Sequence, residues 1–161
     1  MNGFPKPVQR PRPPLLIGAG GPRMLRLAAR EADIVGLQSV ATGSGAVAHD
    51  PRVRLAGAMA EKVAVVREAA GPRFDDLELS VVLSLAVTER PVEAAQALAQ
   101  TRGWDLAPED VLDMPSVALG PPAALEETLL ARRERLGLSY FVVADQCLEA
   151  AAPLVARLTG R

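Results

Sequence analysis

Short apolar runs alternate along this chain with segments whose apolar residues recur at helical spacing. The runs at 15–17, 34–37, 77–87 and 139–143 are typical of strands that are apolar on both faces. Helical spacing predicts helices at 22–32, 51–70, 91–102 and 121–136, and a last helix after Asp145 that is kinked or restarted at Pro153. Residues 104–120 are less regular, with one helical turn expected after Pro108.

Strands and helices therefore alternate four times, which is the pattern of parallel βα units. The predicted fold class is α/β, with four parallel βα units that suit half of an eightfold barrel or a small doubly wound sheet. Five prolines in the first fourteen residues favour an extended form. We therefore divide the chain into a proline-rich arm at 1–13 and one domain at 14–161.

Composition narrows the function classes. Net charge is −1 and aromatic residues make up 3%, so nothing favours nucleic acid or an anionic membrane surface as a partner. The single cysteine excludes an internal disulfide and fits a reducing compartment. No apolar run reaches the roughly 20 residues of a membrane span, and the basic start lacks the apolar centre of a secretory signal. We expect a cytoplasmic protein.

The first predicted strand runs directly into a turn with three glycines in four positions, Gly18, Ala19, Gly20 and Gly21. At the end of a parallel strand, such a turn lets backbone N–H groups approach a phosphate, helped by the positive end of the following helix. The amides of Ala19, Gly20 and Gly21 are the expected donors, with Arg23 near enough to add a charge. A tight turn with glycines for steric reasons alone is the alternative. Neither the dinucleotide fingerprint nor a Walker loop is present.

The stretch PLLIGAGGPRMLRLAAREADIV at 14–35 resembles the segment that opens the second half of bacterial-luciferase-like monooxygenases, especially the deazaflavin-dependent branch. The motif ALGP at 118–121 and the stretch RRERLGLSYFVV at 132–143 are similar to that family's carboxy-terminal helix and last strand. The resemblance covers the chain from about residue 6 to its end.

That resemblance implies strands five to eight of a TIM (β/α)8 barrel. It also implies that Ala19, Gly20 and Gly21 hold the phosphate of the deazaflavin coenzyme F-420 or of FMN, with Gly18 permitting the turn. The family's first half supplies most of the isoalloxazine pocket and the residues beside the substrate. These have no counterpart here, so the catalytic residues are unknown.

Other candidates have plainer interpretations. Gln38 and Ser39 follow the second strand, where they would either contact the edge of a ligand or be loop residues without a functional role. His49 and Cys147 stand almost a hundred positions apart in the chain and predict no metal site. The basic run at 132–135 is expected to be a solvated helix face.

These patterns leave three hypotheses. The first is a luciferase-like oxidoreductase domain that carries the cofactor-phosphate half of the site. The second is a catalytically inactive half-barrel, which folds but performs no chemistry alone. Because four parallel strands leave unpaired edges and an uncovered apolar face, we expect a partner: a second copy, forming a homodimer, or a separate amino-terminal half-barrel. The third is a small doubly wound binder of phosphate ligands.

Overall fold

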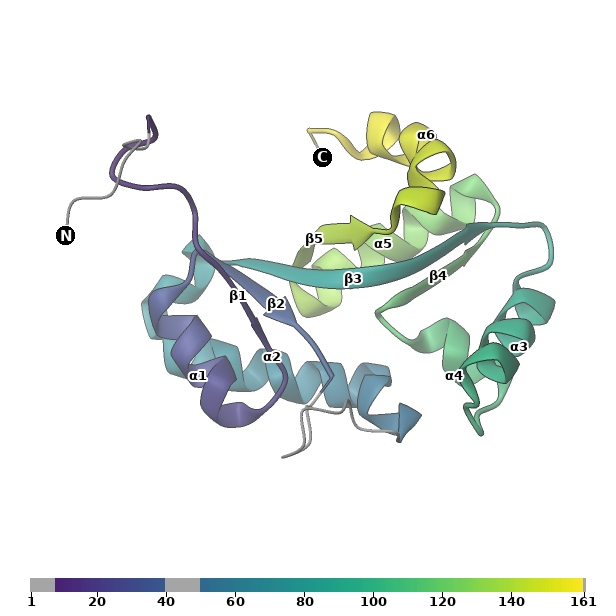
Figure 1. The fold of residues 1–161 in the computed structure, drawn as a ribbon, viewed down its shortest axis with the longest axis horizontal. Helices are drawn as coiled ribbons and strands as arrows, with labels where there is room; N and C mark the ends of the chain where they lie inside the picture. Colours follow the sequence, from purple (N-terminus) through teal and green to yellow (C-terminus); the bar gives the residue numbers. More distant parts are fainter. Residues whose placement is uncertain (1–7, 40–49, 161) are drawn as a thin grey trace.

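Parallel strands alternate with helices in an α/β fold, seen in a computed structural model that describes residues 8–39 and 50–160 (Figure 1). The strands in the described part are β1 (Leu16–Ala19), β2 (Ile34–Leu37), β3 (Glu78–Val87), β4 (Val117–Gly120) and β5 (Leu138–Val143). The α-helices are α1 (Pro22–Glu31), α2 (Ala56–Ala70), α3 (Pro91–Arg102), α4 (Pro108–Asp113), α5 (Pro122–Leu136) and α6 (Leu148–Leu158). Short 3-10 helices lie at Pro51–Arg54, Gly71–Asp76 and Asp145–Cys147.

The sheet is parallel at every pairing and has β3 at its centre. β1 pairs with β2, β2 pairs with β3, and β5 pairs with β3 on the other side. The four strands expected from the sequence thus lie in the order β1, β2, β3, β5. This confirms an α/β fold with a parallel sheet.

β4 is an additional strand that the sequence did not predict, because its four residues show neither alternation nor a long apolar run. It pairs with the carboxyl half of β3, from Ser84 to Val87. The expected helical turn after Pro108 is present as α4.

β4 and β2 lie along the same edge of β3. The amides of Glu78 and Ser84 donate to Asp33 of the β2 side and to Ser116 of the β4 side, at 3.1 and 2.8 Å. Residues an even number of positions apart in a strand send their N–H groups to the same side. Figure 1 shows β2 and β4 diverging from that side, with β5 on the opposite side of β3.

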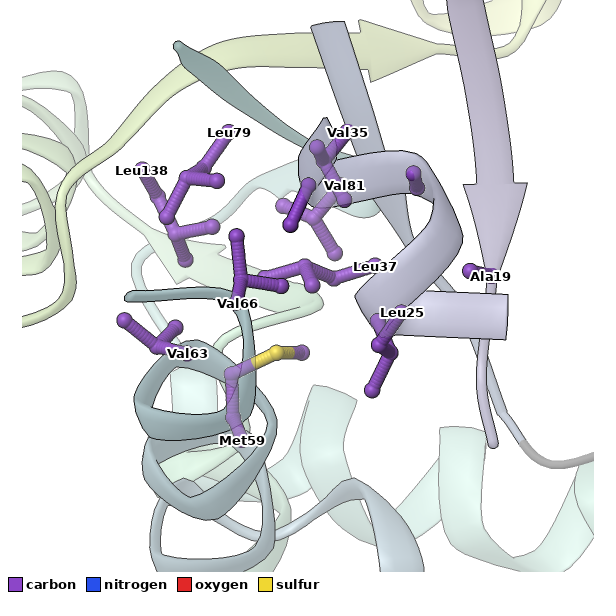
Figure 2. Close-up of a cluster of buried hydrophobic side chains, with 12 residues drawn as sticks. Ala19, Leu25, Val35, Leu37, Met59, Val63, Val66, Leu79, Val81 and Leu138 are labelled. Atoms are coloured by element: carbon purple, nitrogen blue, oxygen red, sulfur yellow. The ribbon is translucent and has the colours of Figure 1, made fainter. Parts of the chain in front are cut away.

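One face of the sheet is packed against helices. Its largest cluster joins side chains of β1, β2, β3 and β5 to α1 and α2, among them Val35, Leu37, Leu79, Val81 and Leu138 (Figure 2). A second cluster joins the carboxyl half of β3 and β5 to α5 and α6, and a third joins α3, α4 and β4. Strand and helix sequences that are apolar on this side supply the core.

The opposite face of the sheet carries apolar side chains that belong to none of these clusters. Strand alternation places Leu16, Ile34, Val82, Tyr140 and Val142 on it, and the registers put Val82 beside Val142. Val82 is 62% exposed and Leu16 is 47% exposed. Parallel sheets are ordinarily covered on both faces. We call this surface the open face.

The end of the proline-rich arm is tied to the domain by Asp33. Its carboxylate accepts from both terminal nitrogens of Arg12, at 3.1 Å from Nη2 to Oδ1, and from the Leu15 amide at 2.6 Å. These hydrogen bonds, with the charge of Arg12 and of Arg73, lower the pKa of Asp33 to about 2.

Two expectations about helices need correction. Asp50 caps the Arg52 amide at 2.9 Å as predicted, but the turn that it caps is a separate 3-10 helix rather than the start of α2. In the basic run, Arg132 is not solvated: it is 8% exposed, and its Nη2 donates to the carbonyls of Met114 and Val117. Burial lowers its pKa to about 10.

Candidate functional site

The turn between β1 and α1 lies at the carboxyl end of a parallel strand, as the sequence indicated. Gly21 is the N-cap of α1 and has extended backbone angles, φ −91° and ψ 154°. Pro22 occupies the first helical position, and the first helical hydrogen bond runs from the Leu25 amide to the Gly21 carbonyl at 3.0 Å. None of the described side chains caps this helix, so its first amides have no side-chain acceptor in the part of the chain that the structure describes.

The amides around the turn have different surroundings. The Ala19 carbonyl accepts from the Gln38 amide at 2.9 Å, so the N–H of Ala19 also faces β2 and serves the sheet. Pro22 has no N–H. The donors best suited to an anion are therefore Gly20, Gly21 and the first-turn amides of Arg23 and Met24.

Gly18 lies inside β1 rather than in the turn. A β-carbon added there would come within 2.6 Å of Gln38 Nε2, and one added to its neighbour Gly36 would come within 3.3 Å of the Gly18 α-carbon. These two glycines let β1, β2 and the Gln38 side chain approach closely. By contrast, a β-carbon at Gly21 would meet none of the described atoms within 4 Å.

Gln38 and Ser39 reach a hollow of about 220 Å³ at the carboxyl end of β2. Arg54 and Lys62 also line this hollow, together with Ser116 from the segment before β4. Sequence reasoning missed Lys62, which stands in the middle of α2 like an ordinary surface lysine but is 9% exposed. Its burial follows from tertiary structure, which brings the carbonyls of Gln38 and Val53 to its Nζ.

Residues 8–39 and 50–160 are the part of the chain that the structure describes. This part of the chain has no group of three or more His, Cys, Asp or Glu side chains placed to hold a metal ion. Within the same part, none of the helices combines the length and the apolar character of a bilayer-crossing segment. His49 lies outside the described residues.

The chain is thus an α/β protein whose first strand is followed by a glycine turn and the start of α1. The family model described as luciferase-like monooxygenase matches residues 1–113. The chain therefore belongs to the luciferase-like monooxygenase family. Among curated protein sequences, none matches it.

Solved structures show the same fold at low sequence identity. A coenzyme F420 dependent tetrahydromethanopterin reductase from Methanopyrus kandleri superposes with a TM-score of 0.56 at 16% identity, over 89% of this chain and 49% of that one. The monooxygenase RslO1 from Streptomyces bottropensis gives a TM-score of 0.56 at 18% identity, over 87% and 43%. The long-chain alkane monooxygenase LadA gives 0.54 at 11%, over 88% and 40%. The chain thus spans less than half the length of each of these proteins.

Proposed function

We propose that this chain provides the cofactor-phosphate-binding half of a luciferase-like oxidoreductase. The cofactor is the deazaflavin coenzyme F-420, with FMN as the alternative. The observation that carries the proposal is the uncapped start of α1, which directly follows a glycine turn at the end of a parallel strand. Membership of the luciferase-like monooxygenase family supports it.

The residues present fit a phosphate in both shape and charge. The open space above Gly21 admits a tetrahedral group, and the amides of Gly20, Gly21, Arg23 and Met24 supply donors at the positive end of α1. The Arg23 side chain is exposed beside the turn and adds a positive charge. Neither Asp nor Glu stands in the first turn of α1 to oppose an anion.

When bound, such a cofactor supplies the redox chemistry, as hydride transfer or oxygen activation. This chain's own contribution is to hold the phosphate end and so to fix the position of the ring system. No residue here is assigned to catalysis.

The second part of the proposal concerns what covers the open face. This face corresponds to the interior of a (β/α)8 barrel of which β1, β2, β3 and β5 are strands five to eight. An amino-terminal half would cover it, either in the same polypeptide or in a separate one, or a second copy would pair with the free edges of β1 and β5. In support, the sheet exposes Leu16, Val82 and Tyr140 on a face that parallel sheets ordinarily bury.

A second candidate is an inactive half-barrel that binds phosphate weakly and catalyses nothing alone. The observation that favours it is that this chain matches at most 49% of the length of each of the three solved structures. In either case we propose a cytoplasmic location, on the strength of the single cysteine.

A titration with F-420 and with FMN, followed by fluorescence, tests whether the turn between β1 and α1 binds the cofactor phosphate. The decisive variant is Gly21→Asp, because the site has space for the side chain and extended backbone angles that Asp accepts. Its carboxylate would cap α1 and occupy the donors that the phosphate needs. We expect the variant to fold at least as stably as the parent and to bind the cofactor at least tenfold more weakly.

Gly57→Asp is the matched control, since Gly57 also lies in the first turn of a helix with nothing within 4 Å of an added β-carbon. It should bind as the parent does. Equal affinity of the parent and Gly21→Asp for the cofactor would overturn the proposed phosphate-binding role of the turn. Absence of binding by the parent would leave the inactive half-barrel as the better account.

A further inference from the structure

The hollow between β2 and β4 has an unusual position in the sheet. β2 is in register with β3 up to Ser80, and β4 begins at Ser84 on the same edge. Among the described residues, Val82 therefore has no strand partner on that edge. The end of β2 and the start of β4 thus leave a gap along this edge of β3, which we call the notch. The hollow of about 220 Å³ lies in the notch, lined by Val81 and Val82 of β3 and by Met59 and Lys62 of α2.

The polar groups around the notch are cationic or neutral. Arg54, Lys62, Gln38, Ser39 and Ser116 line it, and none of its lining residues is acidic. Neither Arg54 nor Lys62 enters a salt bridge between described residues. The segment 40–49 contains neither Asp nor Glu in its sequence, so it has no side-chain carboxylate to offer.

Lys62 is held in place rather than free to swing into solvent. Its Nζ donates to the carbonyls of Gln38 at 2.9 Å and of Val53 at 3.3 Å. An ammonium has three N–H groups, so two hydrogen bonds to described residues leave one for a ligand. Lys62 is 9% exposed, and burial and the charge of Arg54 both lower its pKa.

Arg54 is fixed from the other side. Its guanidinium lies 5.5 Å from the ring centre of Trp104, which orients it across the aromatic face. Burial lowers its pKa, as does the nearby charge of Arg102. Arg54 is thus close enough to both Lys62 and Arg102 for their charges to repel, and an anion beside Arg54 and Lys62 would relieve the repulsion between these two.

We propose that the notch between β2 and β4 binds the oxyanion group of a small organic molecule, with Arg54 and Lys62 as its charged contacts. The hydroxyls of Ser39 and Ser116 are further donors, and Met59 and Val82 give apolar contact to the carbon part of the ligand. The volume suits a group of several heavy atoms, since a liquid water takes about 30 Å³. No residue of the turn at 18–21 is among those that line this notch.

Trp104 provides the measurement. It is the only tryptophan in the chain and lies against Arg54, so its fluorescence reports on the notch. The full chain is titrated with sodium phosphate and, separately, with succinate, with ionic strength held constant by sodium chloride. We expect a saturable fluorescence change with at least one of the two anions; the tighter one identifies phosphate or carboxylate as the preferred group.

Arg54→Gln should weaken that binding at least tenfold while leaving both hydrogen bonds of Lys62 in place. Arg52→Gln is the matched control, because Arg52 lies in the same 3-10 turn but pairs with Asp50 at the surface, and its affinity should stay within twofold. Lys62→Met should also abolish binding; because it removes two structural hydrogen bonds, its circular dichroism is checked against the parent. Calorimetry confirms each dissociation constant independently of Trp104.

Gly21→Asp distinguishes anion binding in the notch from cofactor binding at the turn between β1 and α1. The anion affinity reported by Trp104 should not change in that variant. A fluorescence change that is linear in concentration with both anions, or equal affinity in the parent and Arg54→Gln, would overturn the proposal. So would loss of the signal in Gly21→Asp, since the two sites would then be one.

Discussion

The side chain of Gln38 lies directly against Gly18, so that a β-carbon at Gly18 would come within 2.6 Å of Gln38 Nε2. Gln38 also lines the notch between β2 and β4. Gln38, directly after β2, therefore contacts the strand that leads to the turn at 18–21 and also lines the hollow beside Lys62. The glycines of β1 and β2 are what make this contact possible.

Substitution of the paired glycines should give unequal losses of stability. Gly36→Ala places a methyl group 3.3 Å from the Gly18 backbone, and overpacking of this kind costs about 1–3 kcal/mol. Gly18→Ala meets only the end of the flexible Gln38 side chain and should cost less than Gly36→Ala. Urea denaturation measures both variants, and Gly57→Ala, in open space on α2, should instead gain about 0.5–1 kcal/mol. Equal losses at positions 18 and 36 would contradict the close approach of the two strands.

Asp33→Asn should destabilise the protein in a pH-dependent way. The pKa of Asp33 falls from 3.8 to about 2 on folding, so its carboxylate contributes stability above pH 4. That contribution is lost as the pH falls from about 4 through about 2, because over this range the unfolded state takes up a proton that the folded state binds only near pH 2. The unfolding free energies of parent and variant should therefore differ at pH 7 and converge near pH 2. A difference that is the same at both pH values would show that the hydrogen bonds of Asp33 do not depend on its charge.

Arg132→Met should be strongly destabilising. The change removes the donor to the Val117 carbonyl, whereas the Met114 carbonyl keeps the Val117 amide at 3.0 Å, and an unsatisfied buried group costs about 1–3 kcal/mol. Thermal unfolding checks the loss. Arg135→Met on the exposed side of α5 is the control and should stay within about 0.5 kcal/mol of the parent. A loss as large at Arg135 would mean that the whole basic run, and not the buried guanidinium, stabilises α5.

Val82→Lys should reduce self-association of the isolated chain. Val82 is 62% exposed on the open face, where a lysine would oppose apolar contact with a second copy or another half. Val92→Lys on α3 adds the same charge at a position 49% exposed and away from that face, so it should leave association unchanged. Size-exclusion chromatography with light scattering compares the three proteins. If the parent is a monomer that binds no apolar dye, the open face needs no cover.

The sequence was sufficient for the elements with strong patterns. Helix α3 begins and ends at the predicted residues, since Pro91 and Gly103 mark its ends. β4 could not be predicted, because four residues acquire strand structure only by pairing with β3. The burial of Arg132 was equally invisible: the acceptors that hold it lie on a segment 15 and 18 residues earlier in the chain.

Local sequence was sufficient to predict the turn before α1, but not the side chains that line the hollow at the end of β2. The glycines and Pro22 identify the start of α1 without any tertiary information. Arg54 and Lys62 lie on different elements, and only the packing of α2 against the sheet brings them to the hollow that Ser116 also lines. Charged groups that meet through tertiary structure leave no periodic signal in a single sequence.

β3 takes part in two neighbourhoods at once, since its first half pairs with β2 and β5 and its second half pairs with β4. Its side chains accordingly enter both the cluster under α1 and α2 and the cluster under α5 and α6. Neither cluster can open without exposing amides of the same strand to solvent. The two ends of the domain are thus expected to exchange their protected hydrogens as one cooperative unit, with the slowest amides in the middle of β3.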